Sequence, residues 1–251
     1  MTILVDASLL STDVLWLNTS PHLKLFDQPL LRVLSRAASV VQWEYQHSPD
    51  EASSLSVAVE LLHEYLNSYH KQPVHLVGHS TGGLLGLLYA SQYPEKVKSL
   101  TLLAVGFHPA IDWKAHYYVQ RQLLPCSRQL LLAQMVDSLF GSQNKNICRI
   151  LQNILEKDLD NSASPHSLFQ RVSMAPIRVP VPLLVCGSKD DIAVNIQELQ
   201  RWQKFFKSGD RLWECLQGGH FFHYFYPRCV AGQITDFWLQ SACESMTISE
   251  C

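Results

Sequence analysis

The sequence predicts an α/β protein in which a mostly parallel β-sheet is flanked by helices and interrupted by an inserted helical cap. Short β-branched or apolar runs alternate along the chain with amphipathic segments, a pattern typical of βαβ units. The chain has 251 residues, and folds of this class commonly run to about 250 residues as one domain. The chain is therefore long enough to bury one large core.

The first half of the chain supplies four predicted strands and the helices between them. The strands are expected at 14–17, 39–43, 74–77 and 97–105. Apolar residues at helical spacing predict helices near 25–34, over 55–66 and over 84–93. A polar loop is expected at 46–54.

The next predicted strand, 182–186, comes only after an interval of roughly 70 residues, which is too long for a βα loop. Helical periodicity over 132–140 and 147–155 indicates a helical insertion there. We therefore divide the chain into a core of residues 1–106 and 179–251 and a cap of residues 107–178. The remaining elements are predicted as a helix at 196–206, a strand at 211–216 and a helix at 230–239.

The charge balance and the N-terminal sequence indicate which classes of partner and which cellular location to expect. The chain has 20 basic and 22 acidic residues without a basic run, which argues against nucleic acid or an anionic membrane surface as a partner. No apolar run approaches about 18 residues, so no membrane span is expected. The segment Met1–Asp6 lacks the features of a signal peptide, which favours a cytoplasmic protein.

The cysteines are scattered. There are 7, without a C-x-x-C pair, so we expect neither a disulfide framework nor a zinc cluster but reduced, mostly packing residues.

The strongest motif is Gly78-His79-Ser80-Thr81-Gly82, which matches G-x-S-x-G between a predicted strand and a predicted helix. A serine on so tight a turn has a strained backbone that exposes its hydroxyl. Such a hydroxyl is a weak nucleophile and needs a base, which in turn needs an acid to hold its tautomer. Candidates follow two later strands: Asp190 or Asp191 after one, and His220 in Gly218-Gly219-His220 after the other.

With these three motifs, nearly the whole chain resembles the α/β-hydrolase superfamily, and in particular its cap-bearing, esterase-like members. The resemblance implies that Ser80 is the nucleophile, His220 the base and Asp190 the acid, since Asp190 stands three residues after Gly187 as in the family. Asp191 remains the rival acid and His223 the rival base. A metal site on His220 and His223 is disfavoured because no third ligand is spaced to join them.

The oxyanion of a tetrahedral intermediate needs two donors, usually backbone N–H groups. The resemblance assigns the first to Thr81. For the second, Leu17-Asn18-Thr19-Ser20-Pro21 stands where the family often has His-Gly-x-Pro, so Ser20 is expected to donate, with Thr19 as the alternative. Asn18 could brace this loop through its amide.

The predicted cap is rich in apolar and aromatic residues, such as Trp113, Tyr117 and Met135, which favours a substrate with an apolar acyl or alkyl part. The leading function is hydrolysis of a carboxylic ester or thioester through an acyl-enzyme, with no metal or organic cofactor. Acyl transfer or C–C bond hydrolysis on the same triad is the enzymatic alternative. A non-catalytic ligand-binding protein is the alternative of another class.

Overall fold

One six-stranded sheet forms the centre of the molecule, in the order β2-β1-β3-β4-β5-β6, and every pair of neighbouring strands is parallel. In this computed structural model, residues 14–45 and 54–248 are described, without the side chains of 243–248. Met1–Asp6 and nearly all of the predicted loop at 46–54 lie outside them. The strands are β1 (Val14–Asn18), β2 (Val40–Glu44), β3 (Val74–His79), β4 (Val97–Leu103), β5 (Leu183–Ser188) and β6 (Arg211–Cys215). The predicted parallel α/β sheet is confirmed.

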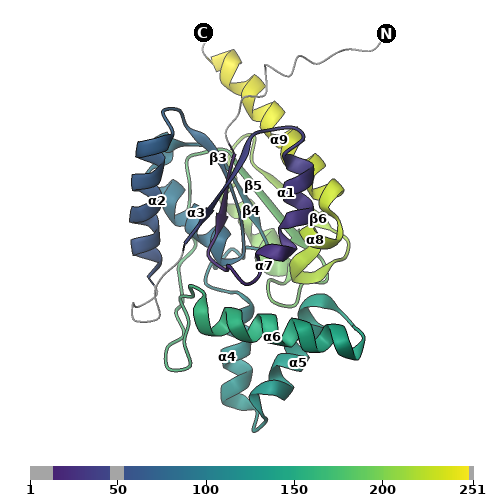
Figure 1. The fold of residues 1–251 in the computed structure, drawn as a ribbon. Helices are drawn as coiled ribbons and strands as arrows, with labels where there is room; N and C mark the ends of the chain where they lie inside the picture. The colour runs from purple at the N-terminus through teal and green to yellow at the C-terminus, as the bar shows by residue number, and fades with distance from the viewer. Residues whose placement is uncertain (1–13, 46–53, 249–251) are drawn as a thin grey trace, which may run out of the picture.

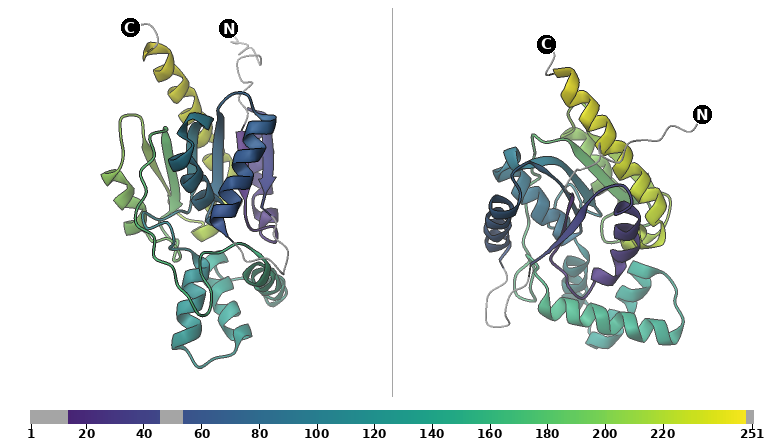
Figure 2. Two further views of the ribbon diagram at one scale, coloured as in Figure 1. Left: turned by 90° about the vertical axis from the view of Figure 1, so that its left-hand side faces the viewer. Right: turned by 45° about the horizontal axis from the view of Figure 1, so that its top comes forward.

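Each face of the sheet has its own apolar core, because successive side chains of a strand point to opposite faces. In β1, Val14 and Trp16 join the core under helices α1 (Gln28–Leu34) and α9 (Pro227–Ile248). Leu15 and Leu17 join the other core, under α2 (Leu55–Tyr69) and α3 (Thr81–Gln92). The two layers of helices are visible on either side of the sheet in Figure 2.

Three helices lie between β4 and β5 along the chain: α4 (Trp113–Leu123), α5 (Arg128–Phe140) and α6 (Lys145–Asn161). They gather at one end of the sheet (Figure 1) and pack around their own core, which also includes Phe26 and Phe221. A buried ion pair joins two of them, since Lys114 Nζ of α4 lies 3.1 Å from Asp158 Oδ2 of α6. The helices expected at 132–140 and 147–155 are confirmed, whereas α4 was not predicted as a helix.

The C-terminal part departs from the prediction in two places, of which one is the unpredicted helical segment formed by η5 (Gly219–Phe221) and α8 (Phe222–Phe225). The helix expected at 196–206 is a short α7 (Ile196–Gln200) continued by the 3-10 turn η4 (Arg201–Lys204). Among the described residues, no helix combines the length and apolarity needed to cross a bilayer.

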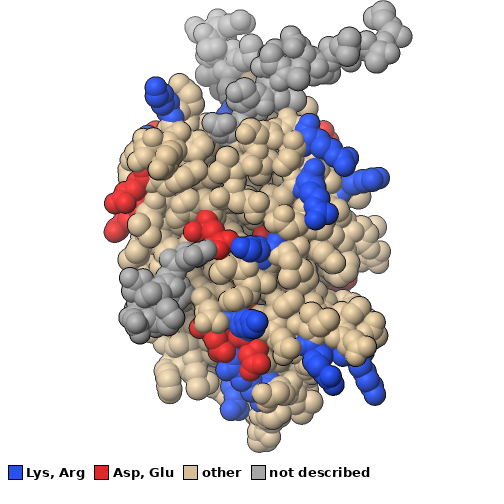
Figure 3. Space-filling model, viewed as in Figure 1, with Lys and Arg blue, Asp and Glu red and all other residues tan. Residues whose placement is uncertain are grey.

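Basic and acidic side chains occur together on the face shown in Figure 3, in keeping with the balanced composition.

Candidate active site

Ser80 stands between β3 and α3 with φ 50° and ψ −121°, one of two non-glycine residues at positive φ among those described. Its backbone N–H donates to the carbonyl of Leu103, which holds the turn against β4. Its Oγ is buried, and within the described chain it has no hydrogen-bond partner. The strained turn is as the G-x-S-x-G motif predicts, but the hydroxyl, which was expected to be exposed, is buried.

The two glycines of the motif are required because the backbone approaches itself closely. A Cβ at Gly78 would lie 2.5 Å from the carbonyl carbon of Gly82. A Cβ at Gly82 would lie 2.3 Å from the carbonyl oxygen of Leu17, at the end of β1. Any side chain at either position would push the start of α3 away from the sheet and displace Ser80.

His220 is paired with Asp191, not with Asp190. The Nδ1 atom of His220 lies 3.0 Å from Oδ2 of Asp191, and both side chains are almost completely buried, at 0% and 1% exposure. The other oxygen of Asp191 accepts the N–H groups of Ala193 and Val194, which fixes its orientation. Among the described residues, Nε2 of His220 has no partner and is therefore free to serve a substrate or nucleophile.

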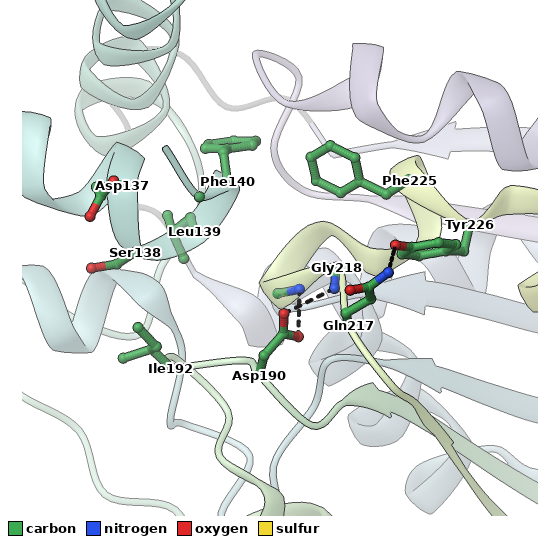
Figure 4. A pocket seen from close by; sticks show the side chains of 12 residues that line it. Asp137, Ser138, Leu139, Phe140, Asp190, Ile192, Gln217, Gly218, Phe225 and Tyr226 are labelled. Carbon is green, nitrogen blue, oxygen red and sulfur yellow. Dashed lines mark hydrogen bonds between the residues drawn. The ribbon is translucent and has the colours of Figure 1, made fainter. Parts of the chain in front are cut away.

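The prediction that Asp190 orients His220 is therefore corrected. The Asp190 carboxylate turns to the loop before His220, where it accepts the N–H groups of Gly218 and Gly219 at 3.1 and 2.9 Å (Figure 4). Burial raises the pKa of Asp190, but hydrogen bonds from Ser188 and from these two glycines outweigh it and lower the pKa overall. Asp190 supports the loop, and spacing from Gly187 did not distinguish that role from the role of Asp191.

The prediction for the second oxyanion donor also changes. The N–H of Ser20 donates to Oδ1 of Asn18 at 2.7 Å, so it is not free to meet an oxyanion. Asn18 thus braces the loop as an Asx-type turn. Thr19 lines a small cavity together with Ser80, Asn18 and Trp113. Thr81, the first residue of α3, has its N–H in the unpaired first turn of the helix.

His79 connects the serine turn to the His220 loop, because its Nε2–H donates to the carbonyl of His220 at 2.8 Å. Burial lowers its pKa well below the usual value, and the nearby His223 and His220 lower it further. His223, the rival base, is directed elsewhere and donates from Nε2 to Oδ1 of Asp27 at 3.0 Å. Sequence reasoning missed Asp27, which lies far from these histidines along the chain.

Two further cavities lie near the Ser80 cavity. A small, mainly apolar one is enclosed by α4, α5 and the loop at 192–193, with Trp113, Met135 and Leu139 in its wall. A larger one of about 350 Å³ lies between the end of α5 and the His220 loop, and its lining includes Asp190 and Phe225 but not Ser80 (Figure 4). Trp113 lines both the cavity at Ser80 and the small apolar cavity under α4 and α5.

Comparison with known proteins identifies the family. A family model for the α/β-hydrolase fold matches residues 44–134. An uncharacterized protein of Synechocystis is 47% identical over 227 residues, which cover 90% of each chain. The chain belongs to the α/β-hydrolase superfamily.

More distant relatives have names that include an activity. The monoacylglycerol lipase abhd6-B of Xenopus laevis is 30% identical over 128 residues, which are 47% of this chain and 37% of the lipase. A solved membrane phospholipase A superposes with a TM-score of 0.73 at 17% identity, covering 92% of this chain and 80% of that one. A meta-cleavage product hydrolase of Pseudomonas fluorescens superposes equally well, at 0.73 and 12% identity, covering 92% of each chain. These two structures share the fold with this protein.

Proposed function

We propose that the protein is a serine hydrolase that cleaves a carboxylic ester or thioester with an apolar acyl or alkyl part. The observation that carries the proposal is the buried Asp191–His220 pair beside the strained Ser80 turn, with Ser80 Oγ and His220 Nε2 both unpartnered among the described residues. Burial without a partner is costly for a polar group, so two such groups, of which Ser80 lines a cavity, favour a catalytic role.

In the proposed reaction, Ser80 Oγ attacks the substrate carbonyl while His220 Nε2 takes its proton. Asp191 holds His220 with the proton on Nδ1 and stabilises the imidazolium. We assign the oxyanion to the N–H groups of Thr81 and Thr19, since Ser20 is already engaged. His220 then protonates the leaving alcohol or thiol, and water releases the acid from the acyl-enzyme.

We assign α4, α5 and α6 as a cap over this site. Trp113, Met135 and Leu139 would receive the apolar part of the substrate in the small cavity beneath α4 and α5. The cavity at Ser80 measures only about 20 Å³, room for little more than one water molecule. Substrate entry therefore requires part of the wall of this cavity to move, and that wall includes Trp113 of α4. The monoacylglycerol lipase relative supports an ester substrate, since its name states that class.

Labelling with a fluorophosphonate probe tests the nucleophile. We expect the parent protein to be labelled stoichiometrically and Ser80→Ala not to be labelled. Ser138→Ala is the matched control, because Ser138 is a second serine beside these cavities and should leave labelling unchanged. Equal labelling of the parent and Ser80→Ala, or no labelling of the parent, would overturn the proposal.

A further inference from the structure

Three side chains beside the Ser80 turn form a cluster of potential metal ligands. Asp27 precedes α1, His79 ends β3, and His223 lies in α8 (Phe222–Phe225). One candidate ligand atom from each lies within 4.8 Å of the other two. Asp27 and His223 are buried and His79 is partly buried, so these are not surface groups that meet by chance.

The hydrogen bonds of the two imidazoles determine where their lone pairs lie. Nε2 of His79 faces the carbonyl oxygen of His220, which can only accept, so Nε2 carries the proton and Nδ1 the lone pair. Nε2 of His223 likewise donates to the carboxylate of Asp27. Its Nδ1 is buried and has no partner within the described residues. To bind an ion together with Asp27, His223 would use Nε2, and the proton that Nε2 now shares with Asp27 would move to the unpartnered Nδ1.

We propose that Asp27, His79 and His223 bind one divalent transition-metal ion of the Zn²⁺ type. Two imidazole nitrogens and one carboxylate oxygen are ligands that such ions favour, and three protein ligands leave a fourth position open. Asp27 and His79 line the cavity at Ser80, so that position faces a cavity rather than packed protein. The negative charge of the Asp27 carboxylate also neutralises part of the positive charge of the ion.

The surroundings would orient the ligands. The indole N–H of Trp16 donates to Oδ2 of Asp27 at 3.1 Å, and the His220 carbonyl holds His79. Such outer hydrogen bonds fix ligand orientation in metal sites. Ligand atoms about 2.0–2.2 Å from a tetrahedral ion lie roughly 3.3–3.6 Å apart. The cluster therefore has to contract by about 1 Å, which side-chain rotation can supply once His223 exchanges its bond with Asp27 for the ion.

Equilibrium dialysis of the parent protein against Zn²⁺ near neutral pH tests the proposal. We expect one bound ion, and at least a tenfold weaker affinity in Asp27→Asn and in His223→Gln. His108→Gln is the matched control, because His108 pairs with the carboxylate of Glu198 on another part of the molecule. Ser80→Ala should bind like the parent, so the result is independent of whether Ser80 is the nucleophile. Absent binding, or equal affinity in the parent and both cluster variants, would overturn the proposal.

A second measurement needs no substitution, so it still tests ion binding at this cluster if a cluster variant fails to fold. Co²⁺ added to the parent protein should give the weak visible bands of nitrogen and oxygen ligation. Strong thiolate-to-cobalt charge-transfer absorption would instead place the ion on cysteines, of which Cys229 is exposed, and would overturn the assignment.

Discussion

The carboxylate of Asp191 lies 3.0 Å from Nδ1 of His220, whereas the adjacent Asp190 accepts hydrogen bonds from Gly218 and Gly219. Two consecutive aspartates after β5 thus hold the same loop at different points. Asp191 contacts the imidazole, and Asp190 contacts the backbone that leads to it. Because the two contacts differ, we expect different effects from substituting Asp190 and from substituting Asp191, although the two residues are neighbours in the sequence.

We expect Asp191→Asn to lower kcat for ester hydrolysis by roughly 10³–10⁴-fold, because an amide no longer holds the tautomer of His220 that accepts the serine proton. Asp190→Asn should cost less than about tenfold, since its remaining carbonyl oxygen can still accept from the glycine loop. Steady-state hydrolysis of a p-nitrophenyl ester by both variants provides the measurement. A larger loss in Asp190→Asn than in Asp191→Asn would show that the triad acid is misassigned.

Acyl-chain selectivity should depend on Trp113, which lies between the Ser80 cavity and the apolar cavity under α4 and α5. Trp113→Leu removes part of this wall while keeping it apolar, so we expect the ratio of kcat/KM for p-nitrophenyl octanoate to that for the acetate to rise several-fold. The ratio is independent of how much enzyme is folded. An unchanged ratio would contradict the placement of the acyl chain.

Gly82 should tolerate no side chain, because a Cβ there meets the backbone oxygen of Leu17 at 2.3 Å. We expect Gly82→Ala to lower the free energy of unfolding by roughly 1–3 kcal/mol and to abolish fluorophosphonate labelling. Gly232→Ala is the control, since Gly232 lies in α9 with nothing within 4 Å of its added Cβ. That change should stabilise the protein by about 0.5–1 kcal/mol, because alanine favours helix over glycine. Urea denaturation distinguishes the two outcomes.

His75 should make stability depend on pH. It is buried in β3, with Ser99 at its Nδ1 and the Trp238 ring against it. Burial, with a smaller contribution from the charge of Lys98, lowers its pKa from 6.5 to about 3. Between these values the unfolded chain binds the proton and the folded chain does not. The contribution of His75 to the free energy of unfolding is therefore complete above pH 6.5. It is lost as the pH falls toward 3, by up to about 1.4 kcal/mol per pH unit.

In His75→Gln this contribution disappears, so the unfolding free energy should fall less steeply between pH 6.5 and 4 than in the parent. Urea denaturation at several pH values gives both slopes. Parallel slopes would mean that His75 is not held neutral by the fold.

The sequence was sufficient to predict the parallel sheet and the serine turn, because both depend on local signals. Alternating apolar runs define the strands, and Gly78 and Gly82 mark a backbone that permits no Cβ. It also placed His220 on the loop after β6, since parallel strands bring such loops to one edge of the sheet.

No local pattern in the sequence shows which aspartate faces His220, or that the N–H of Ser20 is already hydrogen-bonded. Asp190 and Asp191 are neighbours with the same chemistry, and their roles differ only by the direction in which the turn after β5 projects each side chain. Ser20 is occupied because Asn18 folds back on it. Asp27 reaches His223 across 196 positions of the chain, a contact that no local pattern encodes because packing between distant elements creates it.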